Sequence, residues 1–308
     1  MKIIRGTKEF KLNNTAVTLG KFDGMHKGHM SLVNQVVSCG DSGLVPVLFT
    51  FDTSPNEVVS QNKMKYIIDS DEKYEICRKS GIDTVIEYPF DRDTMHMDAE
   101  EFIEKIIIKQ LDAKKVAVGK DFNFGRDRKG NVSLLKSMAG SYELIVKDKV
   151  LYGTNEISST YIRQCIQNGE IEKANYMLGR EYSISGEIIY GKMLGRTIGV
   201  PTINMGVRGD KVLPPFGVYA TITQIDGTEY KGITNIGNNP TVSADNSIKV
   251  ETHLFECSRE LYGMTARVRF YRFIRSEKKF SGVDELRRNM QHDIKTVKTF
   301  FNHCLDTD

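Results

Sequence analysis

Cysteine is scarce in this chain, and no two cysteines lie close together. There are five among 308 residues, which stand too far apart for a disulfide framework or for the paired spacing of a zinc site. They are Cys39, Cys77, Cys165, Cys257 and Cys304. We therefore expect each to be a reduced thiol.

Long hydrophobic runs are also missing. The longest apolar stretch, from Leu44 to Phe51, contains Pro46 and falls well short of the ~20 residues that span a bilayer. The N-terminus carries Lys2 and Arg5 where a signal peptide needs an apolar core. The sequence therefore predicts a cytoplasmic protein with no membrane partner.

The chain has no large excess of charge of either sign. Its 43 basic and 40 acidic residues give a formal net charge of +3, too balanced for the broad basic surface that binds nucleic acid. We expect no nucleic-acid partner and no obligatory protein partner, and any bound anion must be held locally. With 40% hydrophobic and 27% charged residues, the composition excludes a disordered or fibrous chain, and the length fits about two domains.

The N-terminal half has the pattern of a parallel α/β sheet. From residue 16 to about 150, short β-rich runs alternate with helix-period runs, as in successive βαβ units. The predicted strands are Ala16–Gly20, Leu44–Phe51, Thr84–Tyr88, Lys115–Gly119 and Tyr142–Asp148. Helices are predicted near 29–39, 70–80, 99–111 and 131–139, then at about 159–168 and 171–178. Asp98 and Glu101 predict a capping box at the start of the third helix.

After about residue 182 the pattern changes to period-two alternation and tight turns, which indicates a small antiparallel barrel. Asp226-Gly227 stands between two alternating runs and predicts a hairpin. A final segment from about Val283 to Cys304 has apolar residues at three and four spacing and predicts a helix packed on the barrel. We place the domain boundary near Glu181.

A glycine-rich segment follows the first predicted strand and enters a helix. It contains Gly20, Asp23, Gly24, His26, Gly28 and His29. The glycines let the backbone approach a ligand, and a helix N-terminus with two imidazoles on its first turn supplies donors to phosphate oxygens. Taken alone, a short His-x-Gly-His is as easily a tight turn with two surface histidines. The extended string resembles the nucleotidyltransferase superfamily, where such histidines stabilise phosphate charge while pyrophosphate departs.

Two further segments of the N-terminal half fit a phosphate site. Ser159, Thr160 and Arg163 place hydroxyls at a helix start and an arginine one turn later, although an ordinary Ser/Thr cap with a solvated arginine is the commoner outcome of such a string. Between the two segments, a basic, glycine-rich loop leaves the fourth predicted strand, where parallel sheets bind ligands. Its candidate residues are Asp121, Asn123 and Phe124.

The barrel half carries a second candidate site. Residues 191–204 contain Gly195, Arg196, Thr202 and Asn204, and they form no Walker loop. Thr202 and Asn204 stand two apart on an extended segment, so they point to one side and offer oxygen ligands to a hard cation. Glu251 leaves an alternating strand on the face opposite Val250, although an isolated strand glutamate is usually a solvated carboxylate.

The order of these motifs closely resembles riboflavin kinase, and with the first half the chain resembles the bacterial bifunctional riboflavin kinase/FAD synthetase family over nearly its whole length. The motifs are Gly-Arg-x-x-Gly-x-Pro-Thr-x-Asn, Pro215 to Tyr219, Asn235 to Thr241, Glu251-Thr-His and Ile274 to Phe280. The resemblance implies an α/β Rossmann-like FMN adenylyltransferase domain over residues 1–181. It also implies an all-β six-stranded barrel with a C-terminal helix, the riboflavin kinase domain, over residues 182–308.

The resemblance also implies roles for single residues. Thr202 and Asn204 match the magnesium–nucleotide motif of the kinase, with Gly195 and Arg196 in the same nucleotide segment. Glu251 matches the carboxylate that activates the riboflavin 5′-hydroxyl for attack on the γ-phosphate of ATP, and Arg275 is a candidate contact to the flavin edge. In the first domain, His26 and His29 match the phosphate pair of the family. Ser159, Thr160 and Arg163 match its second phosphate segment, and Asp121, Asn123 and Phe124 lie in its nucleotide/flavin loop. The implied ligands are riboflavin, FMN, ATP and Mg²⁺.

One position departs from the family pattern. After the second strand the family has an aromatic residue followed by Pro-His-Pro, whereas Ser54 stands here at the place of that histidine. A serine donates one hydrogen bond but supplies no positive charge, while Lys21, where the family has a neutral asparagine, is a candidate to compensate. The alternatives left open are a kinase whose adenylyltransferase domain is weak or inactive, and a flavin-sensing regulator. The modest charge and the kinase-like second half argue against a class I aminoacyl-tRNA synthetase.

Overall fold

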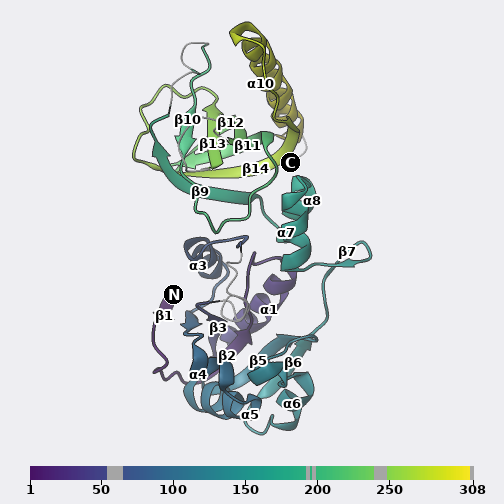
Figure 1. Cartoon of the computed structure of the whole chain (residues 1–308). Helices are drawn as coiled ribbons and strands as arrows, with labels where there is room; N and C mark the ends of the chain where they lie inside the picture. The colour runs from purple at the N-terminus through teal and green to yellow at the C-terminus, as the bar shows by residue number, and fades with distance from the viewer. Residues whose placement is uncertain (54–64, 192–194, 196–198, 239–247, 306–308) are drawn as a thin grey trace. The chain divides into compact units, whose positions relative to one another are not determined.

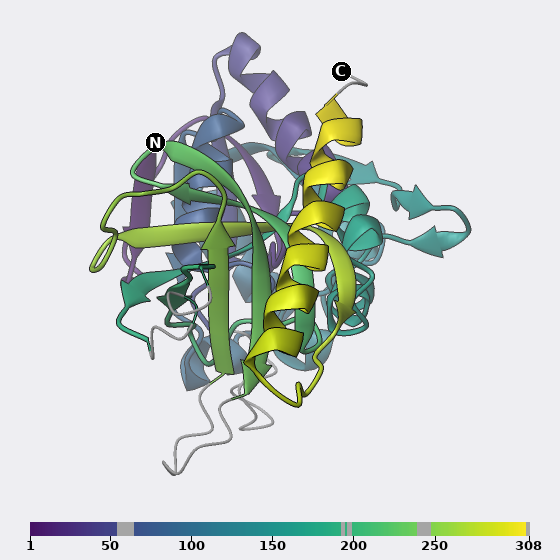
Figure 2. The same cartoon turned by 90° about the horizontal axis from the view of Figure 1, so that it is seen from above.

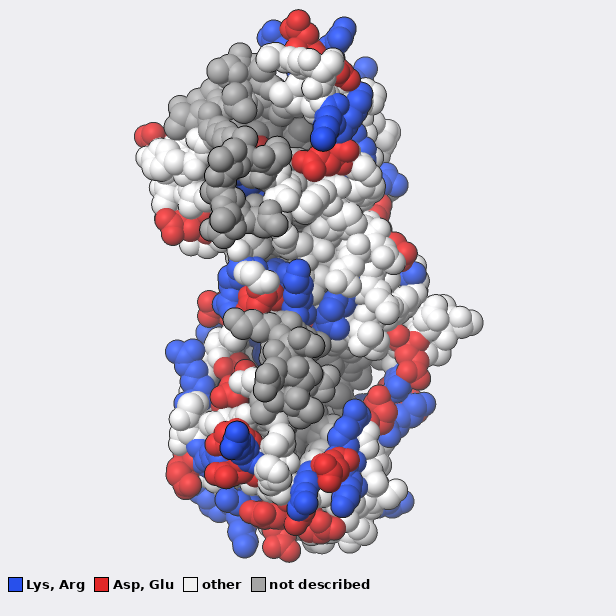
Figure 3. Space-filling view, in the orientation of Figure 1, with Lys and Arg blue, Asp and Glu red and all other residues white. Residues whose placement is uncertain are grey.

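The chain folds into two compact units (Figure 1). The computed structural model describes residues 1–53, 65–191, 195, 199–238 and 248–305. The first unit is Met1–Ser159 and the second is Thr160–Asp308. Among the described helices, none is long and apolar enough to cross a membrane. On the face shown in Figure 3, basic and acidic side chains are interspersed, as the small net charge predicts.

The first unit is built on a six-stranded sheet in which neighbouring strands are parallel. In sheet order the strands are β1 (Lys2–Arg5), β4 (Thr84–Tyr88), β3 (Val45–Phe51), β2 (Thr15–Leu19), β5 (Ala113–Gly119) and β6 (Glu143–Lys147). The five predicted strands are all present, with ends within two residues of the prediction. The prediction missed β1, a short strand whose two isoleucines stand between charged residues and are only half-buried.

Helices and short turns connect these strands. They are α1 (Lys27–Val37), η1 (Ser38–Ser42), α3 (Ser70–Lys79), α4 (Arg92–His96), α5 (Ala99–Phe102), the π-helical η2 (Ile103–Gln110), η3 (Arg126–Arg128) and α6 (Val132–Ser137). A two-stranded hairpin, β7 (Leu151–Tyr152) and β8 (Asn155–Glu156), follows the sheet. The predicted third helix is therefore α5 continued by η2, and α4 and the hairpin had not been predicted.

The capping box predicted at Asp98 is wrong, because the side-chain hydrogen bond that defines it is missing. Asp98 does occupy the N-cap position of α5, but its side chain makes no capping hydrogen bond. Met97 and Phe102, which stand immediately before and four residues after the cap, are both buried in the same core cluster. Apolar residues at these two positions form a hydrophobic staple, which fixes a helix start by packing instead of by a side-chain bond.

The order of the sheet reverses between β2 and β5. The chain runs from β2 outward through β3 to β4, and then crosses back to place β5 on the other side of β2. In open α/β sheets, ligands bind at the carboxyl ends of the strands beside such a reversal. The loops that follow Leu19 and Gly119 are therefore the expected site of the first unit.

The described part of the second unit is a closed six-stranded antiparallel barrel with helices before and after it. Two helices lead into it, α7 (Ser159–Gln167) and α8 (Ile171–Leu178). Around the barrel the strands are β10 (Ile203–Met205), β13 (Ile248–Leu254), β12 (Thr228–Asn238), β11 (Gly217–Ile225), β14 (Thr265–Ser276) and β9 (Tyr182–Ile189). The six-stranded barrel is confirmed, and so is the hairpin, whose turn residues Asp226 and Gly227 both have positive φ, as a type I′ turn requires.

Helix α8 is tied to the barrel through Asn175. Its Nδ2 donates to the C=O of Phe270, and its Oδ1 accepts from the N–H of Tyr182, both at 2.8 Å. Contacts of this kind attach α8 to the barrel, and the second compact unit also includes α7 from Thr160 onward, whereas the boundary near Glu181 assigns both helices to the first domain. That boundary stays a prediction about how the two activities divide.

The C-terminal helix α10 (Val283–Leu305) lies along the outer face of the barrel (Figure 2). Val297 and Phe301 are buried against Val218 and Ala220 of β11 and against Ile233 of β12. The predicted amphipathic helix is confirmed. Residues of α10 also form one side of the cavity described below.

Three threonines form a hydrogen-bonded chain inside the barrel. Thr234 Oγ1 lies 2.8 Å from Thr221 Oγ1 and 2.8 Å from Thr252 Oγ1, and all three residues are almost wholly buried. Each hydroxyl is thus satisfied without water, and the chain crosses three neighbouring strands, β11, β12 and β13.

This arrangement predicts a difference between two Thr→Val changes. Thr234→Val leaves the buried hydroxyl of Thr252 without its partner and leaves that of Thr221 with only its 3.4 Å bond to the Gly232 C=O, so it should lower the free energy of unfolding by about 1–3 kcal/mol. Thr223→Val is the matched control, because Thr223 Oγ1 is buried and has no hydrogen-bond partner among the described residues. Urea unfolding of the intact chain measures both, and equal losses would contradict the role given to the threonine chain.

Candidate active sites

A cavity of about 430 Å³ lies at the carboxyl ends of β2 and β5. It is lined by Gly20, Lys21 and His29 from the first loop and by Asp121, Asn123 and Phe124 from the second, all singled out from the sequence. Much of the remaining wall is aromatic, from Phe22, Phe49, Phe51, Phe90, Phe102 and Phe122. The cavity therefore joins a glycine-rich polar edge to a wall suited to a flat aromatic ring.

The first loop is held in an unusual backbone conformation. Phe22, Gly24 and Met25 have φ values of 51°, 83° and 40°, and non-glycine residues in this region cost of order 1–3 kcal/mol each. The buried side chains of Phe22 and Met25 hold the turn in place. Strain of this kind is typical of functional loops.

His26 and His29 are stacked at the start of α1. Their ring centroids lie 3.6 Å apart, and His26 Nδ1 accepts a hydrogen bond of 3.3 Å from the N–H of His29. Because Nδ1 is an acceptor, the proton of the neutral His26 ring is on Nε2. Gly28 permits this arrangement, since a Cβ there would lie 3.1 Å from the His26 ring. Two imidazoles and a helix N-terminus therefore meet at one point.

Asp23 and Ser159 join this loop to its surroundings. The Asp23 carboxylate accepts hydrogen bonds from the N–H groups of Ile67, at 2.9 Å, and Ile68, at 3.4 Å. The backbone C=O of Asp23 accepts a hydrogen bond of 2.7 Å from Ser159 Oγ. Both predicted residues thus position the loop. Thr160 and Arg163, further along α7, belong to the second compact unit, and their phosphate role stays a prediction.

The second loop is fixed by contacts around Asp121 and Phe124. Lys149 Nζ lies 3.1 Å from Asp121 Oδ2 and also binds Glu156. The bond to Glu156, followed by that to Asp121, raises the pKa of Lys149, so its ammonium stays charged. Asn123 Nδ2 donates to the Asp121 C=O at 2.7 Å. Gly130 is required here, because a Cβ would lie only 2.7 Å from the Phe124 ring.

The barrel register aligns the predicted kinase residues on the outer face. Asn204 of β10 pairs with Glu251 of β13, and Glu251 pairs with Asn235 of β12. Directly paired antiparallel residues share one face of the sheet. Val250 and Thr252 point into the barrel and are buried, so the predicted outward orientation of Glu251 is confirmed.

This row lies beside a cavity of about 230 Å³ on the α10 side of the barrel. Its lining includes Gly195, Thr202, Asn235, Glu251, His253, Arg275 and Asp293. Of these, Asn235, His253 and Asp293 had not been chosen from the sequence. Asn235 and His253 stand inside quoted motifs, whereas Asp293 belongs to a helix whose only signal was apolar spacing.

Asn204 lies beside this cavity and is buried, at 8% exposure. Its Oδ1 has no hydrogen-bond partner among the described residues. A Cβ on Gly191 would lie 2.1 Å from Asn204 Nδ2, so only a glycine fits there. An amide oxygen without a partner, two residues along the chain from the hydroxyl of Thr202, suits a hard cation. In the described part of the chain no group of three His, Cys, Asp or Glu residues is placed to hold a metal, so such an ion would need phosphate oxygens as well.

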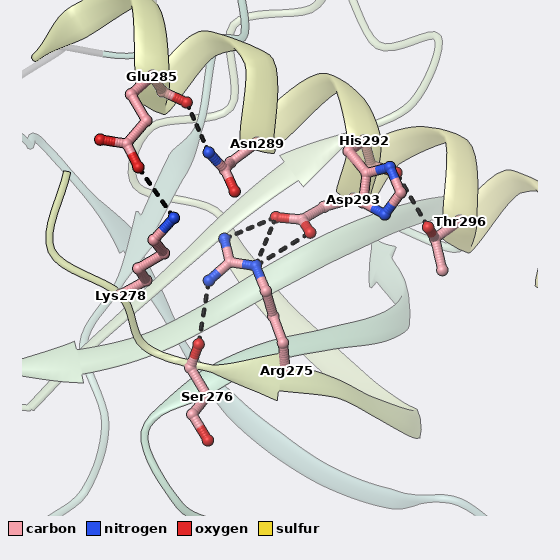
Figure 4. Close-up of polar contacts among 8 residues, drawn as sticks. All are labelled: Arg275, Ser276, Lys278, Glu285, Asn289, His292, Asp293 and Thr296. Atoms are coloured by element: carbon pink, nitrogen blue, oxygen red, sulfur yellow. Dashed lines mark hydrogen bonds and ion pairs between the residues drawn. The ribbon is translucent and has the colours of Figure 1, made fainter.

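Arg275 is bound to α10 by Asp293 (Figure 4). Its Nε and Nη2 lie 2.7–3.1 Å from the Asp293 carboxylate, and Nη1 donates to the C=O of Ser276 at 3.0 Å. The Asp293 side chain is only 3% exposed. Arg275 therefore joins β14 to α10 at the wall of the cavity, and a contact to the flavin edge stays a prediction. Arg196 and Ser54 lie outside the described residues.

Comparison with known proteins finds a family model for each half of the chain. A family model described as FAD synthetase matches residues 8–161, and one described as riboflavin kinase matches residues 178–301. A bifunctional riboflavin kinase/FMN adenylyltransferase from Listeria monocytogenes is 33% identical, covering 96% of this chain and 95% of its own. One of the same name from Buchnera aphidicola (subsp. Schizaphis graminum) is 36% identical over 98% of this chain and 99% of its own.

A solved structure is also similar over nearly the whole chain. It is described as a macrolide-efflux protein from Streptococcus pneumoniae, with 28% identity and a TM-score of 0.87, and it covers 96% of this chain and 98% of its own. The fold is therefore shared along its length. By the two family models and the full-length relatives, this chain belongs to the bifunctional riboflavin kinase/FMN adenylyltransferase family.

Proposed function

We propose that the chain phosphorylates riboflavin to FMN in the barrel cavity and transfers an adenylyl group from ATP to FMN in the cavity of the first unit. The observation that carries the proposal is that each cavity is lined by residues of one family's motifs: Thr202 and Glu251 in the barrel, His29 and Asn123 in the first unit. Because both reactions consume ATP, we infer that the enzyme works in the cytoplasm.

In the kinase reaction, Glu251 is the general base. It accepts the proton of the riboflavin 5′-hydroxyl as that oxygen attacks the γ-phosphorus of ATP, and ADP leaves in line. Thr202 and Asn204 hold the phosphate end of the nucleotide and would hold Mg²⁺ there, which would offset the charge of the phosphates. The support for this role of Asn204 is its buried oxygen without a partner.

Thr202 also suggests the direction of the nucleotide. A smaller hollow of about 80 Å³ lies beside Thr202 and is lined by Leu254, Leu261 and Tyr262 among others. Thr202 is the described residue that lines both this hollow and the larger cavity. With phosphates at Thr202, riboflavin occupies the larger cavity and the rest of the nucleotide extends over the hollow, where the wall includes Tyr262, whose ring is stacked on that of Tyr190.

In the adenylyltransferase reaction, the protein supplies donors instead of a nucleophile. The FMN phosphate attacks the α-phosphorus of ATP, and pyrophosphate leaves. His26, His29 and the N-terminus of α1 stabilise the charge that shifts among the phosphate oxygens. The aromatic wall of the cavity receives the isoalloxazine ring, and Lys21, which lines the same cavity, adds a positive charge.

The first test of the proposal is Glu251→Gln, which keeps the shape of the side chain and removes the proton acceptor. Losing a general base costs about 10²–10⁴ in rate, so FMN formation should fall by at least about 10²-fold while FAD formation from added FMN continues. Glu187→Gln is the control, since Glu187 is an exposed glutamate on β9. An unchanged turnover number for riboflavin in Glu251→Gln would show that Glu251 is not the general base.

The second test is His29→Ala, which removes one donor from the phosphate site of the first unit. Such a donor contributes about 3 kcal/mol to the transition state, so FAD formation should fall by roughly 10²-fold and FMN formation should stay intact. His96→Ala is the control, because His96 is exposed and lies outside the described lining of the cavity. Equal losses of FAD formation in both variants would argue against the phosphate role.

A further inference from the structure

His253 binds the chain at the point where the ladder between β10 and β13 stops. The paired segment of β10 begins at Ile203, so Pro201 and Thr202 precede it, and proline has no N–H to donate. His253 Nδ1 lies 2.8 Å from the Pro201 C=O. A side-chain hydrogen bond from β13 therefore continues the attachment of this segment beyond the end of the ladder.

The chemistry of this contact fixes the state of the imidazole ring. A carbonyl oxygen only accepts hydrogen bonds, so Nδ1 must carry a proton. Burial lowers the pKa of His253, against the opposite effect of the bond to Pro201, and the ammonium of Lys298 on α10 adds to the lowering. The ring is therefore neutral at neutral pH, with its single N–H on Nδ1 and directed at Pro201.

The bond joins the two halves of the proposed kinase site. His253, Thr202 and Glu251 all line the cavity beside α10. Glu251 stands two residues before His253 on the same face of β13, and Thr202 directly follows Pro201. The proposed base is therefore on one strand, the proposed phosphate-binding residue is on the other segment, and His253 bridges them.

We propose that His253 is a positioning residue of the kinase reaction, which holds the Pro201 carbonyl and thereby sets the placement of Thr202 relative to Glu251. The inference rests on the kinase roles proposed above for Thr202 and Glu251. His253 touches no reacting group in this account. Its effect comes from geometry, because a misplacement of about 1 Å in an active site can cost roughly 10²-fold in rate.

Three substitutions separate this role from others. His253→Asn keeps an N–H near the place of Nδ1, whereas His253→Gln moves its amide toward the place of Nε2. His253→Phe keeps a ring and removes both nitrogens. Each variant is assayed in the full chain for KM and kcat with riboflavin and MgATP. FAD formation from added FMN serves as the internal control for folding, and the thermal midpoint of unfolding is measured in parallel.

For His253→Phe and His253→Gln we expect kcat/KM for MgATP to fall by about 10- to 100-fold, with KM for riboflavin within about twofold of the original. His253→Asn should recover most of the loss. A merely structural role would instead lower the thermal midpoint of all three variants without a selective effect on MgATP.

Two results would overturn the proposal. One is a His253→Phe enzyme with unchanged constants for MgATP, and the other is a His253→Asn enzyme as impaired as His253→Phe, which would mean that the ring itself takes part in the chemistry. A failure of the proposed kinase function is distinct from both, because the unsubstituted chain would then form no FMN.

Discussion

The register between β10, β13 and β12 decides whether the barrel can have a kinase site at all. Side chains alternate between the two faces of a strand, so a slip of one residue would move every side chain of the slipped strand to the opposite face. In the observed register, Asn204, Glu251 and Asn235 share the outer face. The buried threonine chain crosses β11, β12 and β13 on the inner face. The buried threonine chain thereby supports the register on which the outer site depends.

In the first unit, loops at strand ends bring the site residues together. The reversal of strand order at β2 places two loops side by side, one with the stacked histidines and one with Asn123 and Phe124. The proposed chemistry needs no protein nucleophile, because FMN itself attacks ATP. What the loops must supply is a set of donors fixed before the reaction starts, and the strained turn at Phe22 and Met25 is consistent with that demand.

Local patterns in the sequence predicted most of the fold. Alternation and turn chemistry were sufficient for the strands, for the Asp226-Gly227 hairpin and for the final helix. The capping bond at Asp98 failed because packing of Met97 and Phe102 holds that helix start. The strand β1 was missed because two half-buried isoleucines give too weak a signal.

The site was predictable where motifs are continuous and not where residues meet through tertiary structure. His26, His29, Thr202, Asn204 and Glu251 all stand in short strings that carry the family pattern. Asp293 comes to the cavity only because α10 packs beside β14, which no local pattern reveals. Likewise, the contact between His253 and Pro201 spans 52 positions of sequence and depends on where the ladder of β10 begins.

The central claim is that one chain carries two separate phosphate-transfer sites that act in succession. The most direct test is a time course in which the purified full chain is incubated with riboflavin, ATP and Mg²⁺, and riboflavin, FMN and FAD are separated by chromatography. The account predicts that FMN appears first and is then converted to FAD, and that added FMN gives FAD without riboflavin. FMN that accumulates with no FAD at any time, or a chain that leaves riboflavin unchanged, would contradict it.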